Sequence, residues 1–177
     1  DASAQFMTSA KALSHKRQLS AKKLTNSINS QLQTLAMSGA NFLVAVTQQL
    51  KKPSSHGIDD IEFLISTNPG QPHKPLNKVV SGGELSRISL AIQVATAQTS
   101  QVATLVFDEV DVGIGGDTAN VVGELLNQLG SKSQVLCITH LAQVASKANH
   151  HWQVSKATKT NSASTNIVCL LQTYNTT

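Results

Sequence analysis

Two short apolar runs, separated by a helix-length segment, constrain the fold of this chain more than any other feature. The runs are VATLVF at residues 102–107 and QVLCIT at residues 134–139. Continuous apolar runs of this length are typical of strands that are buried on both faces. The segment between them predicts a helix that stops at Gly130. This order predicts the α/β class, with a mainly parallel sheet flanked by helices.

The remaining segments after residue 53 fit the same class. IEFLIST at residues 61–67 predicts a strand, and residues 68–78 with three prolines predict a long loop. A helix is expected from Gly82 to about Gln98, and a short one near residues 141–148. HHWQVSK and TNIVCLL, at residues 150–156 and 165–171, predict edge strands.

The first 52 residues predict one long helix. We expect the chain to divide after residue 52, with an α/β domain at residues 53–177. The apolar or small residues of the helix alternate steps of four and three: Ile28, Leu32, Leu35, Gly39, Phe42 and Val46. This is the a/d spacing of a coiled coil, although an ordinary amphipathic helix packed on its own domain explains it equally well. Seven Lys and Arg residues face a single acid, Asp1, in this stretch. Such a charge run is either a solvated face or a nucleic-acid contact.

Composition excludes several classes of protein. No run approaches the roughly 18 apolar residues of a membrane helix, and the N-terminus lacks the apolar core of a signal peptide. Cys137 and Cys169 each lie in an apolar run, so we expect no disulfide framework. A cytoplasmic protein without a membrane partner is expected.

The stretch VVSGGELSRISLAI, at residues 79–92, begins a predicted helix with two glycines. Ser81 and Glu84 have the spacing of a capping box, with Val80 and Leu85 as its hydrophobic staple. A cap does not require glycines, each of which costs about 1 kcal/mol in a helix. Bare N–H groups at the positive end of a helix favour an anion instead. From this stretch alone, both interpretations remain open.

Carboxylates follow the first apolar run directly. Asp108 and Glu109 come after Phe107, and adjacent residues at a strand end point to opposite sides. One can therefore hold a hard cation such as Mg²⁺ while the other positions a water. His140 follows the second run, so we expect it at the same sheet edge. The pattern favours a site that holds a metal ion and a nucleophilic water over a strand end that is charged only because it reaches the protein surface.

Other site types are excluded. GIGGDT at residues 113–118 lacks the third glycine of a dinucleotide fingerprint, and Asp108 and Glu109 would repel a pyrophosphate that lacks a metal. Cys137 and His140 have no second pair at zinc-ligand spacing. An oxidoreductase and a zinc protein are therefore not expected.

Three motifs in order, SGGELSR, TLVFDEVDVG and CITHLAQVA, resemble the signature motif, the Walker B motif with its D-loop, and the switch histidine of ABC-type ATPases. More narrowly, FLISTNPGQPHKPLNKVVSGGELSRISLAI and DEVDVGIGG resemble the RecN family of SMC-like bacterial DNA-repair ATPases, over about residues 14–168. The resemblance implies the C-terminal lobe of a split ATPase head, with residues 1–52 at the base of a coiled-coil arm.

The resemblance also implies a role for each motif residue. Ser81, Gly82, Gly83 and Glu84 would contact ATP held by a second head, with the glycines bare so that this ATP can approach. Asp108 would hold Mg²⁺ through water, and Glu109 would be the general base. His140 would contact the γ-phosphate, and Asp111 would act in the D-loop across the interface. Arg87 would do no more than pair with Glu84.

The sequence contains no Gly-x-x-x-x-Gly-Lys followed by Ser or Thr, so the phosphate-binding loop of such a head is missing. We therefore expect a C-terminal part of a longer protein, inactive alone, which needs an N-terminal lobe. The implied partners are that lobe, a second head in an ATP-bound homodimer, and DNA near the bacterial nucleoid during repair and recombination. A structural SMC or Rad50-type head and, with less support, an ABC transporter ATPase subunit are the alternatives.

Overall fold

The N-terminal helix ends earlier than the heptad spacing predicted. The computed structural model describes residues 1–79, 81–100, 102–159 and 162–170. Helix α1 spans Ala2–Thr34, and strand β1 spans Asn41–Gln48. The prediction of one helix over residues 1–52 is therefore wrong beyond Thr34.

The end of α1 explains the error. The backbone N–H of Met37 donates to Leu32 O at 3.1 Å, and Ala36 has a φ of 54°. This is the pattern of a Schellman cap, in which the left-handed position is usually glycine. Because this chain has alanine at that position, the sequence lacks the glycine that usually marks the end of a helix. The apolar spacing continues past it by coincidence, because Phe42 and Val44 alternate as the buried side of a strand.

A three-stranded antiparallel sheet follows, in the order β1-β2-β3. Strand β2 spans Asp59–Ser66 and β3 spans Lys74–Pro75, with a 3₁₀ turn, η1, at Leu76–Lys78. The division expected after residue 52 falls in the turn between β1 and β2, so it divides one sheet. The strand predicted at residues 61–67 is confirmed, shifted by one or two residues.

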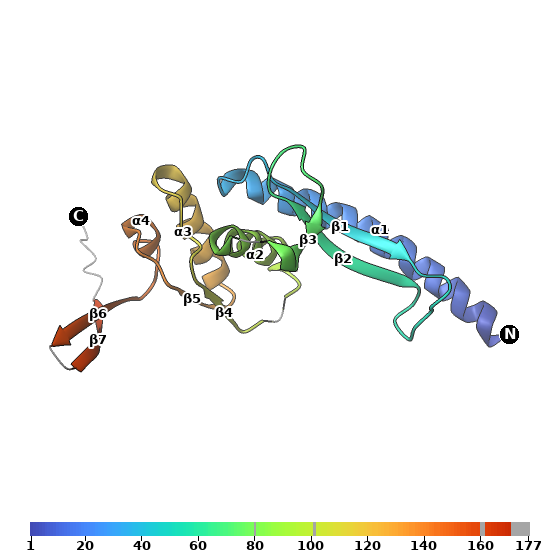
Figure 1. The fold of residues 1–177 in the computed structure, drawn as a ribbon. Helices are drawn as coiled ribbons and strands as arrows, with labels where there is room; N and C mark the ends of the chain where they lie inside the picture. Colours follow the sequence, from blue (N-terminus) through green and yellow to red (C-terminus); the bar gives the residue numbers. More distant parts are fainter. Residues whose placement is uncertain (80, 101, 160–161, 171–177) are drawn as a thin grey trace, which may run out of the picture.

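Helix α1 lies along the edge of this sheet (Figure 1). The Asn29 side chain accepts from Phe42 N at 2.7 Å and donates to Phe42 O at 2.9 Å, while Thr25 Oγ1 accepts from Val44 N at 3.0 Å. An edge strand exposes unpaired backbone groups that invite aggregation. Here the helix satisfies some of them through its side chains.

An ion pair joins α1 to β2. Arg17 Nη1 lies 3.0 Å from Asp59 Oδ2, and the Asp59 side chain is buried. Burial raises the pKa of Asp59, but hydrogen bonds from Ser14 and Arg17 and the Arg17 charge outweigh it, so the pKa lies below its usual range.

Replacing Arg17 with Gln should lower the free energy of unfolding by about 1–3 kcal/mol, because it leaves the buried Asp59 charge without its partner. A carboxyl group with a lowered pKa stabilises the fold above its ordinary pKa of about 3.9 and loses this contribution as pH falls through the lower value. The difference between wild type and variant should therefore shrink below about pH 4. Urea unfolding at pH 7 and pH 3 measures it, with the exposed Lys16→Gln as control. A loss that does not change with pH would contradict this explanation.

Helices α2 and α3 form the centre of the core with the end of β4. Helix α2 spans Gly82–Thr96, close to the prediction, and α3 spans Gly116–Gly130, ending at Gly130 as predicted. The fully buried residues include Ile88, Leu90, Val110 and Val122, in one cluster with Ile28, Leu32 and Phe42. The core is therefore continuous from α1 to α3.

The parallel part of the fold is smaller than predicted. Strands β4, Thr104–Phe107, and β5, Gln134–Cys137, pair in parallel, and within the described residues the other strand pairs are antiparallel. Val106 and Ile138 are 64% and 62% exposed, so the prediction of burial on both faces is wrong in this chain. The mainly parallel sheet is likewise not found, since β4 and β5 are the one parallel pair among the described strands.

The C-terminal strands form an antiparallel hairpin at the far end from the start of α1 (Figure 1). Strand β6 spans His151–Lys159 and β7 spans Ser162–Leu170, after the short helix α4 at Ala142–Ala145. The two strands predicted here, at residues 150–156 and 165–171, are confirmed with shifted bounds, and Leu171 lies outside the described residues. In the described part of the chain, no helix has the length and apolar character needed to cross a membrane.

Candidate functional site

Parallel pairing brings the two polar strand ends together, as expected. Phe107 is the register partner of Cys137, and Ile138 N donates to Phe107 O at 3.0 Å. Asp108 and Glu109 therefore leave β4 beside the segment that carries Thr139 and His140. These candidate residues therefore all lie at the carboxyl ends of β4 and β5.

The two carboxylates after β4 are exposed, and their backbone is fixed from two sides. Asp108 Oδ1 accepts from Glu109 N at 2.9 Å, and Ser86 Oγ of α2 donates to Asp108 O at 2.6 Å. Glu109 has a φ of 56°, a left-handed conformation that is costly for a residue with a side chain. Such conformations persist where surrounding structure enforces them, and they are frequent at functional sites.

Asp111 lies at the centre of a hydrogen-bonded group. Its side chain is 2% exposed, and Oδ2 accepts from the Thr139 hydroxyl and from His140 N at 3.1 Å. His140 Nδ1 lies 3.4 Å from the same oxygen, with its side chain 68% exposed. Burial raises the pKa of Asp111, but these hydrogen bonds and the nearby His140 outweigh it and place the pKa below its usual range.

This position differs from the one expected for Asp111. A D-loop carboxylate that acts across an interface would need an exposed side chain. Here the carboxylate faces inward, and two donors, the Thr139 hydroxyl and the His140 backbone N–H, converge on its Oδ2. It therefore ties the segment of Thr139 and His140 to the turn after β4.

The signature stretch forms the start of α2. Ser81 is the N-cap, and its hydroxyl accepts from Glu84 N at 3.4 Å, as predicted for the cap. The staple predicted between Val80 and Leu85 lies outside the described residues, because it involves Val80. Ser81 and Gly82 are exposed, whereas Gly83 is buried.

Both glycines lie close to the turn that follows β4. A Cβ at Gly82 would require the flexible end of the Glu109 side chain to move. A Cβ at Gly83 would lie 3.2 Å from Val112 Cβ and 3.3 Å from Glu109 O. The start of α2 therefore packs directly on residues 109–112, and the general-base candidate lies beside the signature stretch.

Arg87 was underestimated from the sequence. The residue is 8% exposed, and Nη1 donates to Val112 O at 2.8 Å, while no ion pair with Glu84 occurs among the described residues. Burial lowers the pKa of Arg87, partly offset by the Glu84 charge. The prediction that it only pairs with Glu84 is wrong. Its spacing from Gly83 and Ala91, four residues in each direction, places it on the buried side of α2 and was the missed signal.

Cys137 is not a thiolate nucleophile. Burial, followed by the charges of Asp111 and Asp108, raises the pKa of its thiol to about 11. Both Cys137 and Cys169 are free thiols. The Cys137 thiol stays protonated at neutral pH.

Metal ligands are sparse at the site. Among the described residues, no group of three or more His, Cys, Asp or Glu side chains could hold a metal ion. Mg²⁺ in nucleotide enzymes is usually bound through one or two carboxylates, substrate phosphates and water. The exposed Asp108 therefore fits an ion that arrives with a nucleotide, and it does not fit a resident metal centre.

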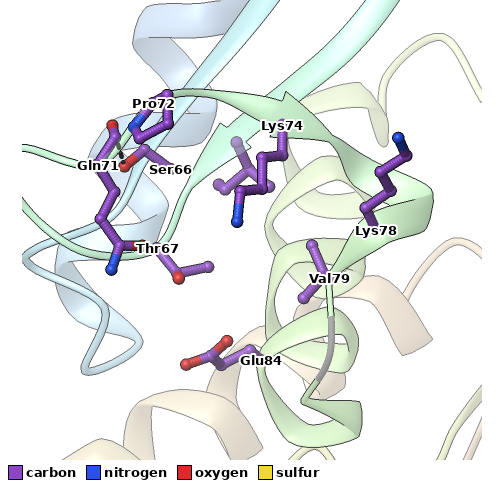
Figure 2. Close-up of a pocket in the computed structure, with 9 residues that line it drawn as sticks. Ser66, Thr67, Gln71, Pro72, Lys74, Lys78, Val79 and Glu84 are labelled. Carbon is purple, nitrogen blue, oxygen red and sulfur yellow. Dashed lines mark hydrogen bonds between the residues drawn. The ribbon is translucent and has the colours of Figure 1, made fainter.

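A cavity of about 180 Å³ lies between the end of β2, the segment 67–79 and the start of α2. Figure 2 shows the side chains of Lys74 and Glu84 pointing toward this space and Lys78 pointing away. Glu84 is the one signature residue that lines it. Asp108, Glu109 and His140 do not, so the cavity and the sheet edge are separate features.

Comparison with known proteins identifies related sequences. The family model described as the RecF/RecN/SMC N terminal domain matches residues 7–163. A protein named DNA repair protein RecN from Haemophilus influenzae is 48% identical over 168 residues, 95% of this chain. The protein of the same name from Vibrio cholerae is 49% identical over 94% of this chain, and that from Treponema pallidum is 40% identical over 93%. The chain spans 30% of the length of each of these relatives.

Solved structures give the same fold at lower identity. The Smc head domain with a coiled coil and joint from Pyrococcus yayanosii matches with a TM-score of 0.58 and 19% identity, over 88% of this chain and 28% of that one. The Smc head of Pyrococcus furiosus, bound to the C-terminal domain of ScpA, has a TM-score of 0.55 and 18% identity, over 87% and 36%. The chain thus has an α/β fold that resembles part of an SMC head domain.

Proposed function

Because the chain belongs to the RecF/RecN/SMC N-terminal domain family, we propose that it is part of a DNA-repair ATPase of the RecN type. It contributes to an ATPase head whose closure on ATP controls how coiled-coil arms hold DNA near broken ends. One observation carries the proposal: the SGGE start of α2, the end of β4 and His140 surround a single turn at residues 109–112.

Glu109 is the general base in this proposal. It would take a proton from the water that attacks the γ-phosphate, and Asp108 would hold the Mg²⁺ that arrives with ATP, which would neutralise phosphate charge. Both carboxylates are exposed at a strand end, where a substrate can reach them. The fixed backbone around Asp108 and Glu109 supports this role, because a base must be held in position.

His140 contacts the γ-phosphate. Its ring is directed by Nδ1 toward Asp111, which leaves Nε2 available for a phosphate oxygen. The buried carboxylate of Asp111 and the Thr139 hydroxyl set the direction of the segment. Asp111 is therefore a positioning residue in our proposal, and its D-loop backbone is the part available to a second head.

The signature residues Ser81, Gly82, Gly83 and Glu84 act on ATP held by a second head. Ser81 is exposed at the start of a 15-residue helix, where backbone N–H groups and the helix dipole attract a phosphate. Two heads of the same kind then enclose the nucleotide. ATP is the cofactor that joins them in a homodimer.

The rest of the head comes from another part of the same protein. Val106, Leu136 and Ile138 are exposed on one apolar face of β4 and β5, which supports a further layer of the head, from an N-terminal lobe, packed against this face. That lobe supplies the phosphate-binding loop, and the present chain alone is inactive. The order of the three motifs places this chain in the C-terminal lobe of the head, whereas the matching family is described as an N-terminal domain.

The protein acts in the bacterial cytoplasm, at the nucleoid. A structural SMC head is the second candidate, because the fold matches Smc heads. The RecN relatives at 40–49% identity favour the repair role over it.

Steady-state ATP hydrolysis by the full-length protein tests the proposal. Hydrolysis that requires Mg²⁺ and a folded head is expected. Full-length protein that binds no ATP and hydrolyses none in the presence of Mg²⁺ and duplex DNA would contradict it.

A further inference from the structure

Two adjacent side chains of α2 reach both ends of the turn that carries the general-base candidate. Ser86 Oγ donates to Asp108 O at 2.6 Å, and Arg87 Nη1 donates to Val112 O at 2.8 Å. Both acceptors are backbone carbonyl groups, and they lie on either side of Glu109 in the chain. We call Ser86 and Arg87 the α2 clamp. One helix therefore holds the turn at two points.

The backbone between these two points has a conformation that needs outside support. Glu109 has a φ of 56°, in the left-handed region that is unfavourable for a residue with a Cβ. Val112 N donates to Glu109 O at 3.2 Å, which closes the turn but does not place it relative to α2. Such a conformation persists where the surrounding structure enforces it. The α2 clamp supplies two of the contacts that do so.

Arginine is a costly residue at a position that is buried in this way. Arg87 is 8% exposed, and within the described part of the chain its Nε has no hydrogen-bond partner. Burial lowers the pKa of Arg87, so its surroundings disfavour the charge. A methionine side chain would fill the same space without these penalties. The hydrogen bond to Val112 O is therefore the specific contribution of the arginine.

The guanidinium group lies where the turn meets the start of α2. A Cβ at Gly83 would lie 3.4 Å from Arg87 Nη1 and 3.3 Å from Glu109 O. The α2 clamp thus acts on the region in which the signature stretch and the general-base candidate meet. A change in this contact would move the backbone of Glu109.

We propose that Ser86 and Arg87 are positioning residues, which hold Glu109 where it can take a proton from the attacking water. Neither side chain needs to touch the nucleotide, because both act on the backbone of the turn. A general base must lie within hydrogen-bond reach of its water, and a small displacement of a catalytic group lowers the rate steeply. The inference rests on the proposed function, in which Glu109 is the base.

Single-turnover hydrolysis of ATP by the full-length protein, in the presence of Mg²⁺, tests the inference in two backgrounds. Arg87→Met should lower the rate of hydrolysis about 10- to 100-fold and Ser86→Ala about threefold to tenfold, with calorimetric ATP binding unchanged. In a protein that already carries Glu109→Gln, Arg87→Met should change the residual rate by less than about twofold. A residue that acts through the base has no further effect once the base is absent.

Two controls separate positioning from a loss of stability. Arg17→Met removes the other arginine of this chain, which pairs with the buried Asp59, so it should lower stability and leave the hydrolysis rate unchanged. Ser89→Ala removes a hydroxyl group from the same helix, where no hydrogen bond of the Ser89 side chain is found among the described residues. It should hydrolyse ATP at the wild-type rate. Ser86→Ala carries the test in both backgrounds if Arg87→Met does not fold.

Three results would overturn the inference. These are equal losses from Arg87→Met in both backgrounds, wild-type hydrolysis by both clamp variants, and a loss of hydrolysis that is matched by a loss of ATP binding. A Glu109→Gln variant with the wild-type rate would instead contradict the assignment of the base, and the inference with it. The failure of this inference is therefore distinguishable from the failure of the proposed function.

Discussion

Replacing Glu109 with Gln is expected to slow ATP hydrolysis by the full-length protein by about two to four orders of magnitude and leave ATP binding intact. The amide keeps the size of the carboxylate but cannot accept the proton of the attacking water. Glu109 is exposed and its side chain touches the start of α2, where Gln fits equally well. The ATP-bound head dimer should therefore accumulate, which light scattering after size-exclusion chromatography would detect.

The exposed Glu62→Gln, on β2, is the matched control because it removes the same charge away from the sheet edge. It should hydrolyse ATP at the wild-type rate. If Glu109→Gln also retained the wild-type rate, Glu109 would not be the base, and the function of its left-handed backbone would need another explanation.

Replacing Ser81 with Arg is expected to abolish ATP-dependent dimerisation of heads and, with it, nearly all hydrolysis. Ser81 is exposed at the start of α2, where our proposal places the phosphate of a second head. A long side chain at this point blocks the approach of that head. Loss of the cap itself costs only about 1 kcal/mol and does not explain such an effect.

Two further variants separate the causes. Ser81→Ala removes the hydroxyl without adding bulk, and it should weaken dimerisation less than Ser81→Arg does. Gln98→Arg adds the same bulk just beyond the other end of α2 and should dimerise normally. Normal dimerisation of Ser81→Arg would mean that the signature stretch does not lie at a head interface.

Sequence-based prediction succeeded where the signal was local or followed from the topology of a parallel sheet. The start of α2 was predictable because Ser81 and Glu84 have a cap spacing that depends on neighbouring residues alone. The meeting of Asp108 and His140 at one sheet edge was predictable because parallel strands align their carboxyl ends. Both inferences rest on local chemistry or a general rule of topology.

The failures have equally specific causes. The end of α1 was missed because Ala36, not glycine, occupies the left-handed cap position. Burial of β4 and β5 was overestimated because their apolar runs indicate a covering layer that the described residues do not supply. The contacts of Arg87 with Val112 and of Gly82 with Glu109 join segments about 25 residues apart, and spacing within one helix carries no information about the other partner.

The measurement that tests the central claim most directly is calorimetric binding of ATP in the presence of Mg²⁺. It is made first on this chain alone and then on the chain mixed with the N-terminal lobe of the full-length protein. The account predicts no binding by the chain alone and clear binding by the mixture, because the phosphate-binding loop and the signature and Walker B residues lie on different lobes. Tight binding of ATP by the isolated chain would contradict the account, since it would require a complete nucleotide site within these 177 residues.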